Sequence, residues 1–274
     1  MEELLNDPAR LKRHIMEALH ERARHVHMFP RGVTNAQNSS AVLCLLGLQP
    51  QRSPSEPCLI FNKRSIRVKQ PGDLCFPGGR VSPKLDALLS FFLKLPCFPL
   101  SRWPYWAGWR KSRLKEARRM ALVFGTALRE SLEEMRLNPL GVQYLGSLPP
   151  QDLRIFSRII CPMVGWVKRQ KRFFTNWEVE SVLYIPLKDL LNHDHYRCYR
   201  LRYDTSPEHP MCGKIQDFPC FLYQREGVRE VLWGATFRIV MEFLDVVFDF
   251  TLQDLGSLPV IHGVLDRNYL RGSG

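Results

Sequence analysis

The feature that most constrains this chain is a long helical pattern, "LKEARRMALVFGTALRESLEEMRL", which spans residues 114–137 and stops at Asn138-Pro139. The residue before a proline is disfavoured in a helix, so the pattern is expected to end there. Near its end, three glutamates fall at spacings i, i+3 and i+4: Glu130, Glu133 and Glu134. This spacing places three carboxylates on one helical face, where like charges repel. We therefore expect a partner that neutralises them.

Two interpretations of this acidic face follow from its residues alone. Hard divalent cations such as Mg²⁺ prefer oxygen ligands, and a bound cation would remove the repulsion among the carboxylates. Arg129, next to Glu130, is a further positive group that could orient or balance the acids. The alternative is an ordinary acidic helix turn that faces solvent. The three glutamates on their own do not decide between the two.

The charge of the chain favours an anionic partner. Among 274 residues, 39 Lys and Arg oppose 27 Asp and Glu, which gives a net charge of +12. Phosphorylated small molecules, nucleic acid and acidic membrane surfaces would all be attracted. No long Lys/Arg block dominates the sequence, so specific nucleic-acid binding is not expected.

The cysteines and the apolar runs indicate a cytoplasmic protein without a membrane-spanning helix. None of the eight cysteines forms a C-x-x-C pair, which argues against a structural zinc site. Several lie in apolar stretches such as "VLCLLGL", where a reduced thiol packs as a small hydrophobic group. The N-terminus carries acids rather than an apolar signal segment, and no uncharged apolar run reaches about 18 residues. A reducing cytoplasm is therefore the expected compartment.

The order of the patterned segments predicts an α/β (α+β) fold, with a mixed β-sheet sandwiched between helices. We expect an N-terminal amphipathic helix at residues 1–30, the main domain at 38–250 and a C-terminal tail without a strong pattern at 251–274. In the main domain, "SSAVLCLLGL" and "CLIFNKRS" predict a hairpin. "VESVLYIPL", "YRCYRLRY" and "FPCFLYQREG" predict further strands, and "GATFRIVMEFLDVVF" predicts an amphipathic helix.

The interpretation of the acidic face also depends on an upstream stretch. It covers residues 59–80 and reads "LIFNKRSIRVKQPGDLCFPGGR". Its glycines after a proline, Gly78 and Gly79, predict close backbone approach or positive φ. Joined to "RESLEEM", the stretch resembles the Nudix hydrolase family, whose box reads G-x5-E-x7-R-E-U-x-E-E-x-G-U with U aliphatic. Gly79 matches the opening glycine. The second half of the box is matched by Arg129, Glu130, Leu132, Glu133, Glu134 and Leu137.

The resemblance is closer to the coenzyme A pyrophosphatase branch of that family. Its members carry a basic step followed by G-x-(V/L)-x-F-P-G-G. The matching residues here are Lys63, Arg64, Ser65, Arg67, Lys69, Gly72, Leu74, Phe76, Pro77, Gly78 and Gly79. "EVESVLYIPLKDLL" (178–191) and "WGATFRIV" (233–240) are similar to later parts of that branch, so the resemblance spans residues 40–245 approximately.

The sequence departs from the box in its middle. Gly79 and Arg129 are 50 positions apart where the box needs 14, so 36 residues are inserted inside it. The middle glutamate of the box has no clear counterpart, because Leu85 occupies its counted position and Asp86 is the nearest acid. We expect the insertion to cover residues 87–122 approximately.

A further departure lies at the end of the box. Arg136 stands where the box has its penultimate glycine. A helix can continue through an arginine, so the tight turn is expected to be made elsewhere, at Asn138-Pro139.

The resemblance implies a metal-dependent hydrolase of diphosphates. Glu130, Glu133 and Glu134 would bind Mg²⁺ or Mn²⁺, which polarises a diphosphate and activates water. The implied catalytic residues are Glu133, Glu134 and Arg129. The general base stays open between one of these carboxylates and an acid from a later loop.

The implied substrate is coenzyme A or a related nucleoside diphosphate-linked compound. The substrate-binding candidates are Arg64, Arg67, Lys69, Gly78 and Gly79, and the 3′-phosphate of coenzyme A would use extra basic groups. A solvated basic strand edge is the alternative for these cations. Two other functions stay open, namely hydrolysis of ADP-ribose or a dinucleotide, and a non-catalytic nucleotide-binding regulatory module with the Nudix fold.

The insertion needs its own interpretation. An apolar helix at residues 85–95 precedes four aromatic residues that alternate with arginines and lysines: Trp103, Tyr105, Trp106 and Trp109. Aromatic rings beside cations suit contact with a membrane surface or a base-stacking lid. The alternative, which we favour, is a helical hairpin that packs on the core or on a second subunit of a homodimer.

Overall fold

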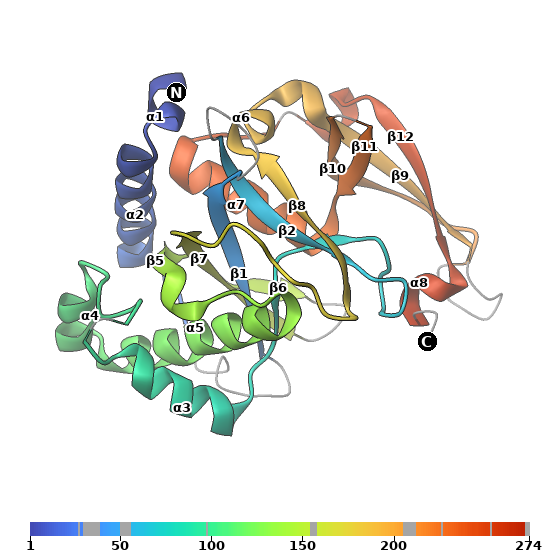
Figure 1. Cartoon of the computed structure of the whole chain (residues 1–274). Helices are drawn as coiled ribbons and strands as arrows, with labels where there is room; N and C mark the ends of the chain where they lie inside the picture. Colours follow the sequence, from blue (N-terminus) through green and yellow to red (C-terminus); the bar gives the residue numbers. More distant parts are fainter. Residues whose placement is uncertain are drawn as a thin grey trace.

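A mixed β-sheet lies at the centre of the computed structural model (Figure 1). The structure describes residues 1–26, 28–29, 39–49, 56–96, 98–153, 158–204, 212–225, 227–252 and 254–271. The strands of this first sheet are β1 (Ser39–Leu48), β2 (Pro57–Arg64), β3 (Leu74–Cys75), β4 (Gly78–Arg80), β5 (Val142–Ser147), β6 (Gln151–Leu153), β7 (Arg158–Val167) and β8 (Val179–Pro186). Its main path runs β3-β2-β1-β7-β5. β1 and β7 are parallel, whereas β1 and β2 form the predicted antiparallel hairpin.

Helices cover the first sheet, and a second sheet stands beside it. The helices are α1 (Glu2–Asn6), α2 (Pro8–His25), α3 (Pro83–Leu93), α4 (Trp106–Ser112), α5 (Leu114–Met135), α6 (Leu187–Leu190), α7 (Gly234–Phe248) and α8 (Arg267–Arg271), with 3-10 turns η2 (Pro139–Gly141), η4 (His193–His195) and η5 (Leu255–Ser257). The second sheet has the order β11-β10-β9-β12, formed by β9 (Tyr196–Asp204), β10 (Ile215–Arg225), β11 (Val228–Leu232) and β12 (Val260–Asp266). The predicted α+β class is confirmed. Among the described helices, none has the length and apolarity needed to cross a membrane.

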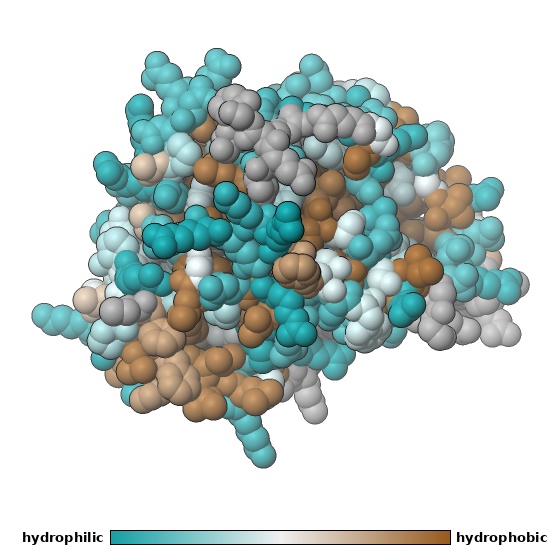
Figure 2. Space-filling model, viewed as in Figure 1, coloured by the Kyte–Doolittle hydropathy of each residue, from teal (hydrophilic) through white to brown (hydrophobic). Residues whose placement is uncertain are grey.

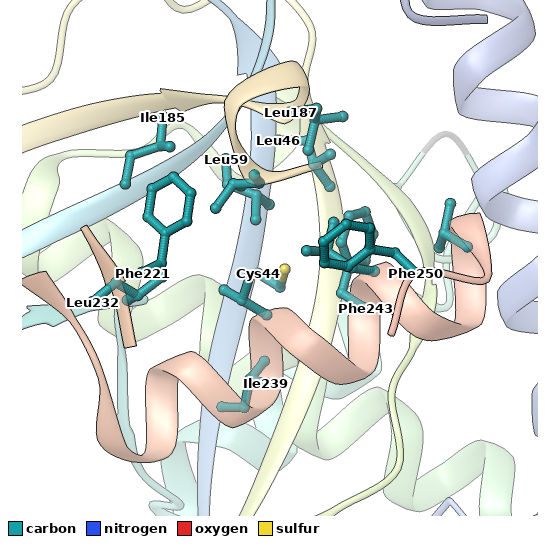
Figure 3. Packing of buried hydrophobic residues seen from close by; sticks show 14 of the residues in the cluster. Cys44, Leu46, Leu59, Ile185, Leu187, Phe221, Leu232, Ile239, Phe243 and Phe250 are labelled. Carbon is teal, nitrogen blue, oxygen red and sulfur yellow. The ribbon is translucent and has the colours of Figure 1, made fainter. Parts of the chain in front are cut away.

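The side chains of β1 divide between two hydrophobic cores. Successive side chains of a strand point to opposite faces, so Leu43 and Leu45 pack toward α5 while Cys44 and Leu46 pack toward α7. Figure 3 shows Cys44 and Leu46 from the sheet opposite Phe243 of α7. A strand buried on both faces reads as a continuous apolar run, which is the pattern of "AVLCLL". The sheet therefore lies between helical layers.

The N-terminal helix predicted for residues 1–30 is two helices. Asp7 accepts hydrogen bonds from the backbone N–H groups of Ala9 and Arg10, 2.9 and 3.0 Å away, and so caps the start of α2. Pro8 is the first residue of α2, where its missing N–H costs nothing. The apolar stripe of α2 is buried against the first sheet and α7. Residues 27 and 30 lie outside the described part of the chain.

The predicted insertion at residues 87–122 contains most of α3, all of α4 and the start of α5. Its tryptophans are core residues, since Trp103, Trp106 and Trp109 are buried beside Tyr144 and Phe124. Their burial is incompatible with an exposed aromatic surface or a base-stacking lid made by these rings. It supports the alternative in which this segment packs on the core.

The C-terminal tail, for which no pattern was evident, contributes a strand to the second sheet. β12 pairs in parallel with β9 through seven register partners, from Val260 opposite Cys198 to Asp266 opposite Asp204. α8 follows, and its Tyr269 is buried against Trp233. The tail thus completes a sheet, and its end packs beside the 64–73 loop that follows β2.

Helix α5 ends at Met135 in a turn made by Arg136 itself. Arg136 has φ 53° and ψ 36°, the left-handed conformation, and its N–H donates to the carbonyl of Leu132. This bond from Arg136 to Leu132 is that of the αL capping motif, and the N–H of Leu137 reaches back to the carbonyl of Ser131 at 3.3 Å. The expectation that the helix runs through Arg136 and turns only at Asn138-Pro139 is therefore wrong. The arginine adopts the conformation that a glycine would adopt without strain.

We predict that Arg136→Gly stabilises the protein, because a left-handed conformation strains every residue that has a Cβ. The free energy of unfolding is expected to rise by about 0.5–1 kcal/mol, measured by urea denaturation. Arg136→Ala is the matched control. Alanine keeps the Cβ, so equal stabilisation by both variants would contradict the strain argument.

Candidate functional site

The predicted glycine turn and glutamate helix lie against each other. A Cβ added to Gly79 would fall 2.5 and 2.6 Å from the two carboxylate oxygens of Glu130, so a larger residue would displace this carboxylate. Gly78 comes equally close to β1, where an added Cβ would lie 2.6 Å from the Cα of Val42. Close backbone approach is thus the role of both glycines. The residues between Gly79 and Arg129 do not separate the two halves of the motif.

Arg129 is the centre of the polar network at this junction. Its Nε donates to Asp86 Oδ1 at 2.8 Å, and its Nη2 donates to the carbonyl of Arg80 at 3.0 Å. The same guanidinium forms ion pairs with Glu130 at 2.9 Å and with Glu133 at 3.2 Å. Opposite charges surround it, so the pKa of Arg129 is raised despite its partial burial. It holds two of the three predicted metal ligands in place.

Asp86 is the acid that the sequence left without a clear role. Its carboxylate is fully buried and accepts hydrogen bonds from the Ser82 N–H at 2.6 Å and the Thr126 hydroxyl at 2.7 Å, besides Arg129. Leu85, at the counted position of the box glutamate, is 57% exposed. The internal acid of this motif is therefore Asp86. A count of residues along the box points to Leu85, one position before Asp86, and the packing of α3 on α5 shows which of the two faces Arg129.

Glu134 is the most perturbed carboxyl group of the site. Burial and the nearby charge of Glu130 raise its pKa to about 8, although the Asn62 side chain and the Gly78 N–H donate to it. Asn62 Nδ2 lies 2.9 Å from Glu134 Oε2 and comes from β2, on the opposite wall of the site. The charge of Glu178, in the loop before β8, also raises the pKa of Glu134. Asn62 and Glu178 were not anticipated as site residues, since neither stands in the box.

The predicted phosphate-binding cations lie on the loop that follows β2. The Nε of Arg64 donates to the carbonyl of Lys69 at 2.8 Å, while Arg67 and Lys69 are exposed. Cys75 lies near the charges of both Arg64 and Glu134, which places Arg64 on the side of the glutamates. Within the described residues, no contact joins Arg67 or Lys69 to the acidic face, so their role stays a prediction.

The same loop is tied to the C-terminal helix. Asp73, at its end, accepts hydrogen bonds from Trp233 Nε1 at 3.1 Å and from the Tyr269 hydroxyl at 2.6 Å. The Gln70 N–H donates to the carbonyl of Tyr269 at 2.7 Å. Burial raises the pKa of Asp73 despite these donors. The second sheet and α8 therefore hold the loop that carries the predicted substrate-binding residues.

Comparisons with known proteins agree with this geometry. No family model matches the chain. The uncharacterized Nudix hydrolase NudL of Pectobacterium atrosepticum is 40% identical over 68 residues, which cover 24% of this chain and 35% of that protein. The peroxisomal coenzyme A diphosphatase NUDT7 of Mus musculus is 25% identical over 211 residues, 72% of this chain and 70% of that protein. In sequence, the chain is therefore similar to Nudix hydrolases.

The match to the first of these Nudix relatives, NudL, spans about a third of that relative's length. Among solved structures, a MutT/nudix family protein from Enterococcus faecalis superposes with a TM-score of 0.40 at 11% identity, covering 89% of this chain and 75% of that chain. The NUDIX domain of Shewanella oneidensis NrtR, solved with ADP ribose, gives a TM-score of 0.33 at 16% identity, covering 62% of this chain and 85% of that chain.

The chemistry of the acidic face of α5 fits a hard divalent cation. Burial raises the pKa of Glu130 and Glu134, and a bound cation would offset the charge that burial disfavours. In the described part of the chain, however, no three His, Cys, Asp or Glu side chains already surround one point. Arg129 pairs with Glu133 and with one oxygen of Glu130. Mg²⁺ is often held by one or two carboxylates and substrate phosphates, which suits the remaining donors.

We predict that the two acids bound by Arg129 differ strongly in their contribution to stability. Asp86→Ala should lower the free energy of unfolding by about 3–5 kcal/mol, because it removes the buried partner of Arg129 and of two further donors. Glu133→Ala is the matched control, since its side chain is 54% exposed and pairs with the same guanidinium. Its cost should stay below about 1 kcal/mol. Equal costs in urea denaturation would contradict a structural role for Asp86.

We predict a pH-dependent stabilisation in Glu134→Gln, measured without metal in EDTA. The folded pKa of about 8 lies above the ordinary value of 4.5, so the stability that Glu134 contributes is present below pH 4.5 and is lost as the pH rises to 8. The variant should unfold like the parent near pH 4.5 and be about 1–3 kcal/mol more stable near pH 8.5. Glu17→Gln, exposed on α2, is the control. A difference independent of pH would contradict the raised pKa.

Proposed function

We propose that this protein is a metal-dependent Nudix hydrolase that cleaves the diphosphate of coenzyme A or a related nucleoside diphosphate-linked compound. The observation that carries the proposal is the contact of Glu130 with Gly79, because it brings the acidic helical face of α5 to the glycine turn. Glu134 adjoins the same turn through the Gly78 N–H. Backbone N–H groups and buried carboxylates beside one another suit a diphosphate and its counterion.

Glu130, Glu134 and Glu133 are the residues that would hold Mg²⁺ or Mn²⁺. When bound, the ion supplies Lewis-acid charge that polarises phosphoryl oxygens and lowers the pKa of water. The chain's own part is positioning. Arg129, fixed by Asp86, holds the carboxylates of Glu130 and Glu133 at the mouth of the glycine turn.

Two carboxylates are candidates for the general base. Glu134 is one, because it adjoins the glycine turn and the Asn62 amide donates to its carboxylate at 2.9 Å, which orients it. Glu178, in the loop before β8, is the candidate from a later loop, and it lies near enough to raise the pKa of Glu134. Its backbone carbonyl accepts from the Ser65 N–H at 2.8 Å, which places it beside the loop of the predicted phosphate-binding cations.

Coenzyme A is the proposed substrate because of the cations after β2 and the likeness to NUDT7, a coenzyme A diphosphatase. Arg64, Arg67 and Lys69 would bind the phosphates, and an arginine fork suits that task. ADP-ribose and dinucleotides are the alternative substrates. We propose the cytoplasm as the compartment, because Cys44, Cys161 and Cys220 are buried in apolar surroundings where a reduced thiol packs as a small hydrophobic group.

The test is a substrate panel of coenzyme A, ADP-ribose and a dinucleotide, each with Mg²⁺ and with Mn²⁺, with products separated by ion-exchange chromatography. We expect coenzyme A to give 3′,5′-ADP and 4′-phosphopantetheine. Glu133→Gln and Glu134→Gln should each lower kcat/KM by about 100-fold or more, because each removes a negative oxygen ligand. Glu17→Gln, exposed on α2, should keep the parent rate.

Three outcomes would contradict the proposal in different ways. Full turnover in excess EDTA would contradict the metal dependence. Faster turnover of ADP-ribose or a dinucleotide would move the substrate away from coenzyme A. Nucleotide binding without any turnover would favour the non-catalytic regulatory module.

A further inference from the structure

The outer face of α3 is apolar and exposed. Leu85, Leu88 and Phe91 are 57–58% exposed, and Phe92 is 40% exposed. Successive members are one or three positions apart in the eleven-residue helix α3. This spacing keeps their side chains on one face, where they form a continuous stripe. Figure 2 shows hydrophobic residues gathered at the lower left of the molecule, over the position of α3 in Figure 1.

The inner face of α3 is more polar than the outer face, which reverses the usual pattern of a surface helix. Asp86 and Ser90 are buried against α5, and Leu93 is the large apolar residue buried beside them. The inversion follows from the site, because Asp86 must reach Arg129. A helix held in this orientation exposes its leucines and phenylalanines together. Such contiguous patches usually mark an interaction surface.

The segment that contains this stripe is strongly positive. Residues 83–119 contain nine Lys and Arg against two acids, Asp86 and Glu116. Asp86 is buried on Arg129, and Glu116 pairs with Arg113, so neither acid offsets the remaining cations. Among the residues that the structure describes, the charged groups of six of these cations have no hydrogen-bond or ion-pair partner: Lys84, Lys94, Arg110, Lys111, Lys115 and Arg118.

Some of these cations crowd one another beside the apolar stripe. Lys94 follows directly after α3, and partial burial together with the charges of Arg118 and Arg110 lowers its pKa. An anionic surface would relieve this repulsion. A second copy of the chain, packed face to face, would instead bring the same positive groups against each other.

We propose that the outer face of α3 docks on an anionic phospholipid membrane surface. Leu85, Leu88, Phe91 and Phe92 would enter the interfacial layer, and the surrounding lysines and arginines would contact lipid headgroups. Apolar residues flanked by cations are the pattern of helices that lie in the membrane interface. The helix would lie on the membrane rather than cross it, since it has eleven residues.

The test is flotation of the full chain with lipid vesicles. We expect binding to phosphatidylcholine vesicles that contain about 30% phosphatidylglycerol, and little binding to phosphatidylcholine alone. The bound fraction should fall when the salt concentration rises from about 0.1 M to about 0.5 M. The double variant Leu88→Ser/Phe91→Ser should bind the anionic vesicles about ten-fold more weakly, because it removes the apolar anchor.

Two controls separate docking from misfolding. Ile215→Ser removes another exposed apolar side chain, 61% exposed at the start of β10, and should bind vesicles like the parent. Lys94→Gln/Arg118→Gln should weaken binding to anionic vesicles while the stripe is intact. All variants should keep the parent melting temperature, because the substituted side chains are not part of the buried core.

Several results would overturn the proposal. Absence of vesicle binding by the parent would do so directly. Equal loss of binding in Ile215→Ser would show that the stripe has no special role. Dimerisation of the parent that is abolished by Leu88→Ser/Phe91→Ser, without vesicle binding, would assign the stripe to a second copy of the chain. None of these results depends on whether the site hydrolyses coenzyme A.

Discussion

The buried ion pair of Arg129 and Asp86 is the interaction on which the arrangement of the site depends. One guanidinium joins three segments, since it binds the carbonyl of Arg80 after the glycine turn, Asp86 on α3, and Glu130 and Glu133 on α5. Asp86 also binds the Ser82 N–H and thereby fixes the start of α3. The charge of Arg129 is fully surrounded on its inner side. Because Asp86 already holds Arg129, a metal ion that binds Glu130 and Glu133 is not needed to keep this junction folded.

The opposite wall of the site is also fixed by buried polar contacts, here with the second sheet and its neighbouring helices. Asp73 is buried with two donors, Trp233 and Tyr269, which belong to elements far along the chain. Lys63 adds a second link, since its ammonium lies 2.9 Å from Glu230 of β11. The loop with Arg64, Arg67 and Lys69 is thus held at both ends by the C-terminal third of the protein. We infer that the second sheet serves to position a loop as well as to close a core.

The sequence predicts the parts of this structure whose side chains repeat with a strong period. The apolar positions and acidic face of α5, and the doubly buried β1, follow from such patterns. β12 escaped notice because its side chains are mostly exposed, so no apolar alternation reveals it. The turn at Arg136 escaped because tertiary packing imposes a left-handed conformation that arginine itself does not favour. Asp73 and Tyr269 are 196 positions apart, and no local pattern relates them.

The role of Asp86 shows most clearly why a count along the motif was insufficient. Aspartate has one methylene fewer than the box glutamate, so Asp86 reaches Arg129 because α3 packs directly on α5. α3 packs on α5 at Gly125, where even an added Cβ would be in ordinary van der Waals contact with α3, 3.4 Å from the carbonyl oxygen of Asp86 and 3.5 Å from Leu89 Cβ. Two helices in such close contact fix the rotation of α3 about its axis. Once Asp86 faces inward, Leu85, Leu88, Phe91 and Phe92 must face outward. The outward orientation of the stripe is therefore a geometric consequence of how the arginine is held.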